Sequence, residues 1–496
     1  MLEYLKNESN LTYTENGAVT YISSLSECLD FFARIGGMRG AKENEIIDLF
    51  TRAFADSSDM AMRLLFYTRD IRGGIGERNA FRVILRNLAF SHPESVKKNI
   101  SIIPEYGRYD DLLVLLGTPC ENDVISFISE TLKKDKDAMT KGEQISLLAK
   151  WLPSVNASNS DTVRSAKLIA KRLSMSDRNY RKMLSSMRAY LKILENALRE
   201  RDYTFDYEKQ PSQAMLKYNG AFIRNDEKRY KSYLNDVKNG EKDLKTNTLA
   251  PYQIIAPIVN GPYGPYYEVP YSESEILSLD TTWNALEDFT NGENAIAVVD
   301  GSGSMYCNYG FLSATPASVA MSLGIYFAER STGAFHNHFI TFSETPRLVK
   351  IKGNNIVDKT RCCMSYNEVA NTNIEAVFRL LLKTAVKNKL PQTELPSTVY
   401  IISDMEFDRC AKDAEITNFE NAKKLFAKHG YKLPLIVFWN VNSRTASVPV
   451  TKNDQGAVLV SGVSPRIFSM IKSHNYDPIT FMIEILESER YSSISA

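Results

Sequence analysis

The residues best suited to chemistry follow a short apolar segment in the C-terminal part of the chain. The stretch NAIAVVDGSGS (294–304) places Asp300, Ser302 and Ser304 at alternate positions, directly after five apolar residues. The apolar run has the composition and length of a buried parallel strand. One carboxylate and two hydroxyls at this spacing can point at a common centre, and oxygen donors alone suit a hard cation. We therefore expect a Mg²⁺ site here, with Mn²⁺ or Ca²⁺ as alternatives.

Two further oxygen donors occur downstream in comparable settings. Thr372 lies in NTNIEAVF, at the start of an amphipathic helical pattern, and Asp404 closes a second apolar segment, STVYIISD. This order resembles the metal-ion-dependent adhesion site (MIDAS) of von Willebrand factor A (vWA) domains. The resemblance implies that Asp300, Ser302, Ser304, Thr372 and Asp404 serve one cation, directly or through water. The alternative is a metal-free cluster of caps and hydrogen bonds, which would leave the two aspartates as neighbouring like charges.

No catalytic set accompanies these residues, so we expect a protein that is not an enzyme. Ser302 and Ser304 have no histidine in a nearby motif to act as a base, and GSGS is not a nucleophile elbow. The glycines of RDIRGGIGER (69–78) lack the Walker spacing of a phosphate loop. Glu406 and Asp408 follow the second apolar segment, STVYIISD, where they either bias the cation site or lie in a solvated loop.

The bulk composition is that of a globular protein with two or three domains. The 496 residues exceed one ordinary core, and 60 basic against 59 acidic residues give no global field toward nucleic acid or membrane. The polar N-terminus has no signal-peptide core, and no apolar run is long enough to span a bilayer. Six scattered cysteines without a C-x-x-C pair favour reduced thiols. These features predict a soluble cytoplasmic protein.

The N-terminal half is expected to be helical. Residues 25–202 repeat helix-length segments with apolar residues three and four apart, as in NEIIDLFTRAFA (44–55). Successive helix pairs without strands predict a HEAT-like array, in which each pair buries its apolar face on its neighbour. Residues 203–290 are rich in clustered tyrosine, proline and glycine, which predicts an irregular crossing between domains. Residues 1–24 form an N-terminal extension.

Residues 291–496 alternate predicted strands and helices. We expect strands at 295–299, 336–342, 398–403 and 433–439, and helices at 316–331, 373–388, 413–429, 464–473 and 477–488. Such alternation predicts a doubly wound, mostly parallel, Rossmann-like sheet. Ligands of such sheets bind beyond the carboxyl ends of the strands, where Asp300 and Asp404 both fall. The fold class is thus multidomain, α followed by α/β.

A basic segment lies at the end of the helical region. Ser176 is expected to cap one long helix over 177–201, with Leu184 and Met187 in its buried stripe. Opposite this stripe, basic residues three and four apart could track the phosphates of RNA, or could form a solvated face. The candidate RNA-binding residues are Arg178, Arg181, Lys182, Arg188, Lys192 and Arg199.

Several motifs in order resemble one protein family. They are TRDIRGGIGER (68–78), PEYGRYDDLLVL (104–115), AKWLPS (149–154), YEKQPSQAMLKYNGAF (207–222) and the vWA-like segments. Together they resemble the DUF2828 proteins, which are related in architecture to the TROVE-domain Ro ribonucleoproteins. The resemblance implies a TROVE-like ring of helical repeats over 25–290, closed by a vWA domain over 291–496. It also implies binding of structured RNA on a basic outer face and of loose RNA ends in the hole.

These observations favour a non-enzymatic, Mg²⁺-dependent binding scaffold with RNA as the first candidate ligand, a Ro-like ribonucleoprotein component. The alternative is a protein-interaction module or structural particle component, in which the cation captures a carboxylate of an acidic protein partner. Neither reading involves a membrane or a nucleotide cofactor. The near-neutral net charge favours the alternative, whereas the basic segment favours RNA.

Overall fold

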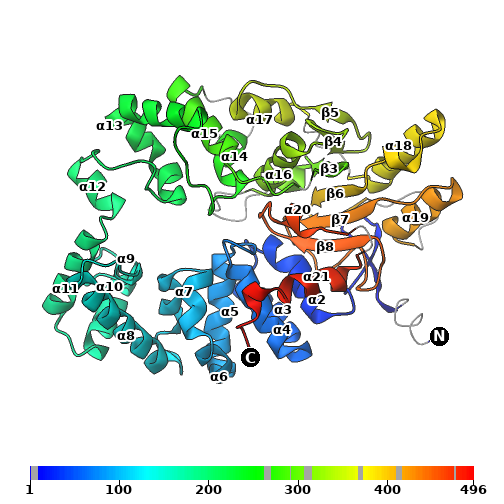
Figure 1. The fold of residues 1–496 in the computed structure, drawn as a ribbon. Coiled ribbons are helices and arrows are strands. Elements are labelled where there is room, and N and C mark those ends of the chain that lie inside the picture. The colour runs from blue at the N-terminus through cyan, green and yellow to red at the C-terminus, as the bar shows by residue number, and fades with distance from the viewer. Residues whose placement is uncertain are drawn as a thin grey trace.

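In this computed structural model, the described residues are 1, 9–261, 270–290, 292–306, 315–366, 372–408, 416–473 and 476–496. They form a long series of helices followed by a six-stranded sheet with flanking helices (Figure 1). This arrangement confirms the predicted α followed by α/β fold class. Among these residues, no helix combines the length and apolar character needed to cross a bilayer. The four described cysteines are free thiols, while Cys307 and Cys410 lie outside the described residues.

The helical region begins directly after a small antiparallel hairpin, β1 (Leu11–Tyr13) and β2 (Val19–Tyr21). Its helices form because apolar residues recur at helical spacing, as in α3, where Ile46, Leu49, Phe50 and Ala53 are buried. The helices up to residue 172 are α2 (Glu27–Arg34), α3 (Glu43–Asp56), α4 (Ser58–Arg69), α5 (Arg78–Ser91), α6 (Pro93–Lys97), α7 (Ile103–Tyr106), α8 (Glu121–Thr140), α9 (Leu148–Trp151) and α10 (Ser160–Arg172).

The predicted long helix over 177–201 is in fact two helices, α11 (Asp177–Tyr190) and α12 (Leu194–Glu200). Ser176 caps the first as predicted, because its side chain accepts a hydrogen bond from the Asn179 N–H. The helix stops because Lys192 has a left-handed backbone with φ of 48°. The basic residues on either side of this break therefore do not share one helix face.

The prediction of an irregular crossing over residues 203–290 is wrong for most of that segment. It contains α13 (Ser212–Lys238), α14 (Pro251–Asn260) and α15 (Glu273–Asn284), while residues 262–269 lie outside the described residues. The tyrosines that suggested a loop instead build a small core. Tyr207 packs against the rings of Phe222, Tyr230 and Tyr233, with ring centroids 5.1–5.5 Å apart. Aromatic residues thus stabilise a helical pair here.

The sheet has the order β5-β4-β3-β6-β7-β8, with all pairs parallel except the antiparallel edge strand β5. The strands are β3 (Ala295–Asp300), β4 (His338–Phe342), β5 (Leu348–Lys350), β6 (Thr398–Ser403), β7 (Leu435–Asn440) and β8 (Ala457–Ser461). Its helices are α16 (Pro316–Arg330), α17 (Ile356–Met364), α18 (Ile374–Asn388), α19 (Asn418–Lys428), α20 (Ile467–Met470) and α21 (Pro478–Leu486). The sequence predicted the four central strands, but not β5, β8 or α17.

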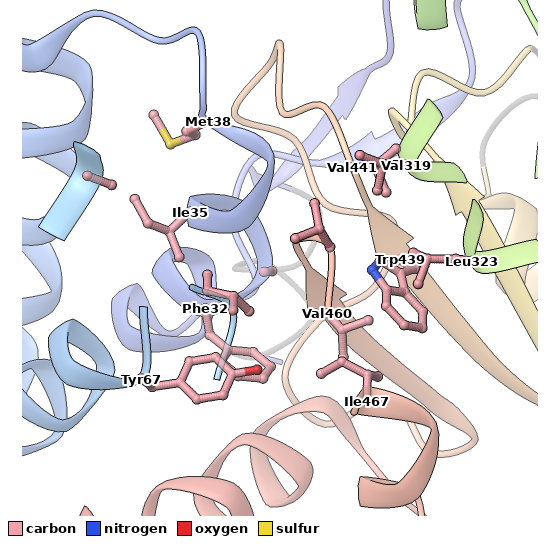
Figure 2. Packing of buried hydrophobic residues seen from close by; sticks show 14 of the residues in the cluster. Phe32, Ile35, Met38, Tyr67, Val319, Leu323, Trp439, Val441, Val460 and Ile467 are labelled. Carbon is pink, nitrogen blue, oxygen red and sulfur yellow. The ribbon is translucent and has the colours of Figure 1, made fainter. Parts of the chain in front are cut away.

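Both ends of the helical region pack against the sheet domain. At one end, α2 contacts β8 and α21, and at the other end α14 contacts α16 (Figure 1). Gly36 lies so close to Gly462 that an added Cβ would be 2.4 Å from the Gly462 nitrogen. Phe32 and Tyr67 from the helices share one buried cluster with Trp439, Val460 and Ile467 (Figure 2). The helical region and the sheet domain therefore have a continuous core.

The start of the helical region also meets its end. The Arg39 guanidinium lies 5.1 Å from the centre of the Tyr252 ring on α14, and it pairs with buried Glu77. A cavity of about 120 Å³ lies at this junction, lined by residues 71–76, 246–253 and 463–466 among others. The chain thus curves through its helices and returns to its starting point beside the sheet domain.

Candidate functional site

The sheet brings the two predicted aspartates to one edge. Asp300 is the last residue of β3, and Asp404 follows β6 directly. These strands are parallel neighbours, with Val299 paired to Ile402, so their carboxyl ends lie side by side. Asp300 and Asp404 are each 2% exposed. The two aspartates, which come from separate segments of the sequence, therefore lie together beyond the carboxyl ends of the strands, where such sheets bind ligands.

Asp300 is held by hydrogen bonds from two neighbours. Its Oδ1 accepts from the Ser302 backbone N–H at 2.9 Å, and its Oδ2 accepts from the Ser403 hydroxyl at 2.6 Å. Burial raises the pKa of the Asp300 carboxyl from 3.8 to about 7, and repulsion from Asp404 adds to the rise. A divalent cation at this edge would offset both effects, since it would stabilise the charged form of each carboxylate.

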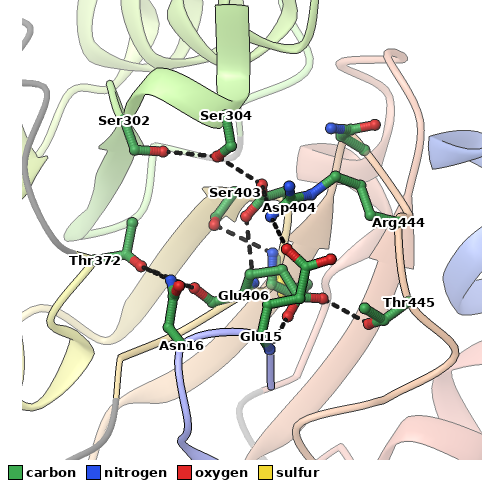
Figure 3. Close-up of polar contacts among 12 residues, drawn as sticks. Glu15, Asn16, Ser302, Ser304, Thr372, Ser403, Asp404, Glu406, Arg444 and Thr445 are labelled. Atoms are coloured by element: carbon green, nitrogen blue, oxygen red, sulfur yellow. Dashed lines mark hydrogen bonds and ion pairs between the residues drawn. The ribbon is translucent and has the colours of Figure 1, made fainter. Parts of the chain in front are cut away.

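The two serine hydroxyls connect to the second aspartate. The Ser302 and Ser304 hydroxyl oxygens are 3.0 Å apart, and Ser304 donates to Asp404 Oδ2 at 2.8 Å (Figure 3). The other Asp404 oxygen accepts from the Glu406 N–H at 3.2 Å. Four of the five predicted ligands, Asp300, Ser302, Ser304 and Asp404, are therefore brought together.

Thr372 belongs to an adjoining group rather than to the Ser304–Asp404 chain. Its hydroxyl donates to the Glu406 carbonyl at 2.8 Å, and the Asn16 side-chain amide approaches it at 3.5 Å (Figure 3). Residues 367–371, which precede Thr372, lie outside the described residues. Thr372 and Asp404 are thus joined through Glu406, because that residue contacts both.

Glu406 is not in the solvated loop that the sequence left open as one alternative. It is 2% exposed, and its carboxylate accepts from the Thr445 hydroxyl at 2.5 Å and from the Glu15 N–H at 2.7 Å. Burial raises its pKa above the ordinary value. Asp408 pairs through its backbone, with its N–H donating to the Thr372 carbonyl at 2.9 Å. Both residues therefore support the edge that carries the site.

The N-terminal turn is the part of the site that sequence reasoning missed. Glu15 and Asn16, between β1 and β2, lie beside Asp404, Glu406 and Thr372 (Figure 3). Arg444 joins this turn to the site, since one guanidinium nitrogen lies 2.8 Å from Glu15 and 3.4 Å from Asp404. No sequence signal could have indicated these contacts, which join residues some 390 positions apart.

The donor set fits a hard cation. It consists of two carboxylates and two hydroxyls, which are oxygen ligands of the kind that Mg²⁺ and Mn²⁺ accept. Across the part of the chain that the structure describes, no three His, Cys, Asp or Glu side chains gather as a metal-binding group. A cation at this edge would therefore depend on the serine hydroxyls and water as well as on the aspartates.

Most of the predicted RNA-binding residues are exposed, but they are divided between two helices. Arg178, Arg181 and Lys182 are exposed on α11, whereas Lys192 lies in the break and Arg199, on α12, pairs with Glu200 at 3.0 Å. The neighbouring helix α10 adds exposed basic residues, and it contacts α11. The exposed basic surface on α10 and α11 consists of Arg164, Lys167, Lys171, Arg172, Arg178, Arg181 and Lys182.

Arg188 does not lie on the free basic face where the sequence placed it. Its guanidinium donates to the carbonyls of Ala149 and Leu152, at 2.8 and 2.6 Å, and to the Ser154 hydroxyl at 2.7 Å. These acceptors follow or belong to α9, so Arg188 satisfies carbonyl groups at the end of that helix. Burial lowers the pKa of this guanidinium. Arg188 thus has a structural role between α11 and α9.

Comparisons with known proteins give the following similarities. Residues 14–125 and 121–293 match the family model described as "Domain of unknown function (DUF2828)", and residues 294–478 match "Domain of unknown function (DUF7788)". "Uncharacterized protein L728" of Acanthamoeba polyphaga mimivirus is 31% identical over 97% of this chain and 88% of its own length. The crystal structure of the Deinococcus radiodurans RO (RSR) protein is 15% identical, with a TM-score of 0.49 over 94% of this chain and 99% of that chain.

Proposed function

The chain belongs to the DUF2828 family, and we propose that it is a non-enzymatic binding scaffold whose ligand is held through a divalent cation at the edge formed by Asp300 and Asp404. The observation that carries the proposal is the meeting of two buried aspartates and two serine hydroxyls at the carboxyl ends of adjacent strands. A bound Mg²⁺ keeps positions for water or for an acidic group of a ligand. Asp300 and Asp404 would hold the cation, and the two hydroxyls would complete its coordination.

Calorimetric titration with Mn²⁺ tests the metal site. We expect wild type to bind one Mn²⁺, and an Asp300→Ala variant to lose affinity by about tenfold or more, because a ligand carboxylate is missing. Glu344→Gln is the matched control, since Glu344 is an exposed carboxylate shortly after the neighbouring strand β4. Equal affinity in wild type and Asp300→Ala, with folding intact, would refute the metal site.

RNA is the first candidate ligand of this scaffold. The exposed basic surface on α10 and α11 supports it, because neutralisation of phosphates by lysine and arginine supplies most of the affinity in non-specific nucleic-acid binding. Within the described residues, Arg178, Arg181 and Lys182 have no acidic neighbour at ion-pair distance, whereas Arg164 and Arg172 pair with Asp161 and Glu121. Arg178, Arg181 and Lys182 therefore form the part of this surface best suited to a phosphate backbone.

Gel-shift measurements over a range of salt concentrations test RNA binding. Replacing Arg178, Arg181 and Lys182 together by alanine should flatten the dependence of log affinity on log salt by about 2–3, since each lost phosphate contact removes about 0.7–0.9. The same triple replacement at Lys133, Lys134 and Lys136, which are exposed on α8, is the control. No RNA binding by wild type at micromolar protein in about 50 mM salt would overturn the RNA proposal.

An acidic protein partner is the second candidate, and one contact favours it. The Glu15 carboxylate pairs with Arg444, whose guanidinium also lies 3.4 Å from Asp404, and this arrangement supports capture of a carboxylate from a turn at this edge. If wild type binds Mn²⁺ at Asp300 but no RNA, capture of a partner carboxylate becomes the leading function.

A further inference from the structure

The turn between β1 and β2 covers the candidate metal edge, and we name residues Thr14–Gly17 the N-terminal strap. Three hydrogen bonds fasten it to the segment after β6, and a longer contact joins it to Thr372. The Thr14 hydroxyl donates to the Phe407 carbonyl at 2.6 Å, and the Glu15 N–H donates to the Glu406 carboxylate at 2.7 Å. The Asn16 amide donates to the Glu406 carbonyl at 2.7 Å and approaches Thr372 at 3.5 Å. The strap therefore lies beside Thr372 and on the segment that follows Asp404.

The strap is held mainly by its backbone and by Thr14 and Asn16. Gly17 forms an isolated bridge with Asp408, and Tyr21 of β2 forms a separate bridge with Val448. These contacts fix the position of the strap without the Glu15 side chain, which is 49% exposed. The Glu15 carboxylate is thus positioned at the edge while remaining able to change its partner.

Arg444 is the present partner of that carboxylate, and it is shared with the site. One of its guanidinium nitrogens lies 2.8 Å from Glu15 Oε2 and 3.4 Å from Asp404 Oδ2 (Figure 3). A single cationic group thus holds together one strap carboxylate and one carboxylate of the metal edge. A divalent cation bound to Asp404 would compete with Arg444 for both, because it carries the higher charge.

We propose that, when a cation binds at the Asp300–Asp404 edge, the Glu15 carboxylate moves from Arg444 to the cation and becomes its internal ligand, so that the strap and an external acidic ligand compete for the same place. This inference rests on the proposed metal site and names the chain's own N-terminal strap as its resident occupant. An external ligand binds only when the Glu15 carboxylate is displaced. Displacement of the carboxylate leaves the other hydrogen bonds of the strap in place, since they do not involve that carboxylate.

Mn²⁺ titration of the full-length Glu15→Gln variant tests the inference. We expect its affinity to fall by about tenfold, because a neutral amide is a weaker ligand for a hard cation than a carboxylate. Glu344→Gln, which removes an equal charge from the same side of the sheet, should bind like wild type. Thermal unfolding should show that both variants are folded, since the strap backbone contacts remain.

A second measurement separates a ligand from a merely structural residue. The paramagnetic relaxation of water protons by bound Mn²⁺ reports how many water molecules contact the ion. Loss of an internal carboxylate ligand should admit one additional water, so the relaxation per bound Mn²⁺ should rise in Glu15→Gln and not in Glu344→Gln. Equal relaxation in Glu15→Gln and wild type would overturn the inference, as would equal affinity.

The two proposals fail in different ways. If wild type binds no Mn²⁺, or if Asp300→Ala binds it as well as wild type, the metal site itself is refuted. If Asp300→Ala loses binding while Glu15→Gln retains wild-type affinity and relaxation, the metal site stands and the internal-ligand inference is wrong.

Discussion

At the scale of single residues, the proposed metal site depends on the proximity of Asp300 to Asp404. Burial of two like charges is costly unless they are protonated, hydrogen-bonded or neutralised by a cation. The structure supplies hydroxyl donors from Ser403 and Ser304, and it supplies Arg444 on the Asp404 side. The pKa of Asp300 is nevertheless raised, because these donors do not fully offset the burial of its carboxylate and the repulsion from Asp404.

A pH dependence of stability follows from that pKa. The folded-state pKa of Asp300, about 7, lies above the ordinary value of 3.8. At a pH between these two values, the folded protein holds a proton on Asp300 that the unfolded chain has released. The contribution of Asp300 to stability is therefore complete below the ordinary value and is lost as pH rises through about 7. With chelator present, Asp300→Asn should lack this loss.

Urea unfolding of wild type and Asp300→Asn on both sides of this window measures the effect. The difference in the free energy of unfolding should shift in favour of the variant at the higher pH. A difference that does not change with pH would contradict the raised pKa.

Arg188 gives a second prediction at this scale. Arg188→Ala should lower the free energy of unfolding by about 2–3 kcal/mol, because carbonyls at the end of α9 would lose charged donors. Arg181→Ala, on the exposed side of α11, should change it by less than about 0.5 kcal/mol. Chemical denaturation compares the two variants, and similar values for both would show that Arg188 has no structural role.

At the scale of elements, the sequence predicted best where one segment determines its own structure. The apolar runs at 295–299 and 398–403 have the length and composition of buried strands, which they form, and their order placed Asp300 and Asp404 correctly. The segment 203–290 was misread because tyrosine, proline and glycine are common in loops, whereas Tyr207 and its neighbours form a packed core. The site around Glu15 and Arg444 could not be predicted, since it depends on contacts between distant segments.

A buried aspartate connects the C-terminal segment to the first helices. Asp70 is fully buried and accepts from the Arg490 guanidinium, from the Tyr491 hydroxyl at 3.0 Å and from the Arg72 N–H at 2.9 Å. Asp70→Ala should destabilise the protein by about 2–3 kcal/mol, because the Tyr491 hydroxyl and the partly exposed Arg490 guanidinium lose their acceptor. It should also speed tryptic cleavage at Arg490.

Asp59→Ala is the control for this prediction. Asp59 contacts the same C-terminal segment, where it accepts from the Ala496 N–H at 2.7 Å, but the contact is exposed. It should cost less than about 1 kcal/mol and leave cleavage at Arg490 unchanged. Equal cleavage rates in wild type and Asp70→Ala would show that Asp70 does not anchor the segment.

At the scale of the whole molecule, the helical region and the sheet domain form a closed path. The helices leave the sheet domain near α2 and return to it through α14 and α15, and Arg39 meets Tyr252 where the two ends approach. The packing of α2 on β8 places the N-terminal turn, which precedes α2, at the candidate metal edge of the C-terminal domain.

Small-angle scattering tests this closure in solution. The curve should match one compact particle with the dimensions of the structure, because both ends of the helical region are packed on the sheet domain. A profile of two domains that tumble independently would contradict the closed arrangement.

The central claim is that Asp300 and Asp404 hold a divalent cation together with Ser302 and Ser304. Anomalous X-ray scattering from a crystal of the wild-type protein soaked in Mn²⁺ tests it most directly. We expect one anomalous peak within coordination distance of Asp300 and the serine hydroxyls, at about 2.0–2.4 Å from their oxygens. A peak elsewhere, with the Ser304–Asp404 hydrogen bond unchanged and this edge free of Mn²⁺, would contradict it.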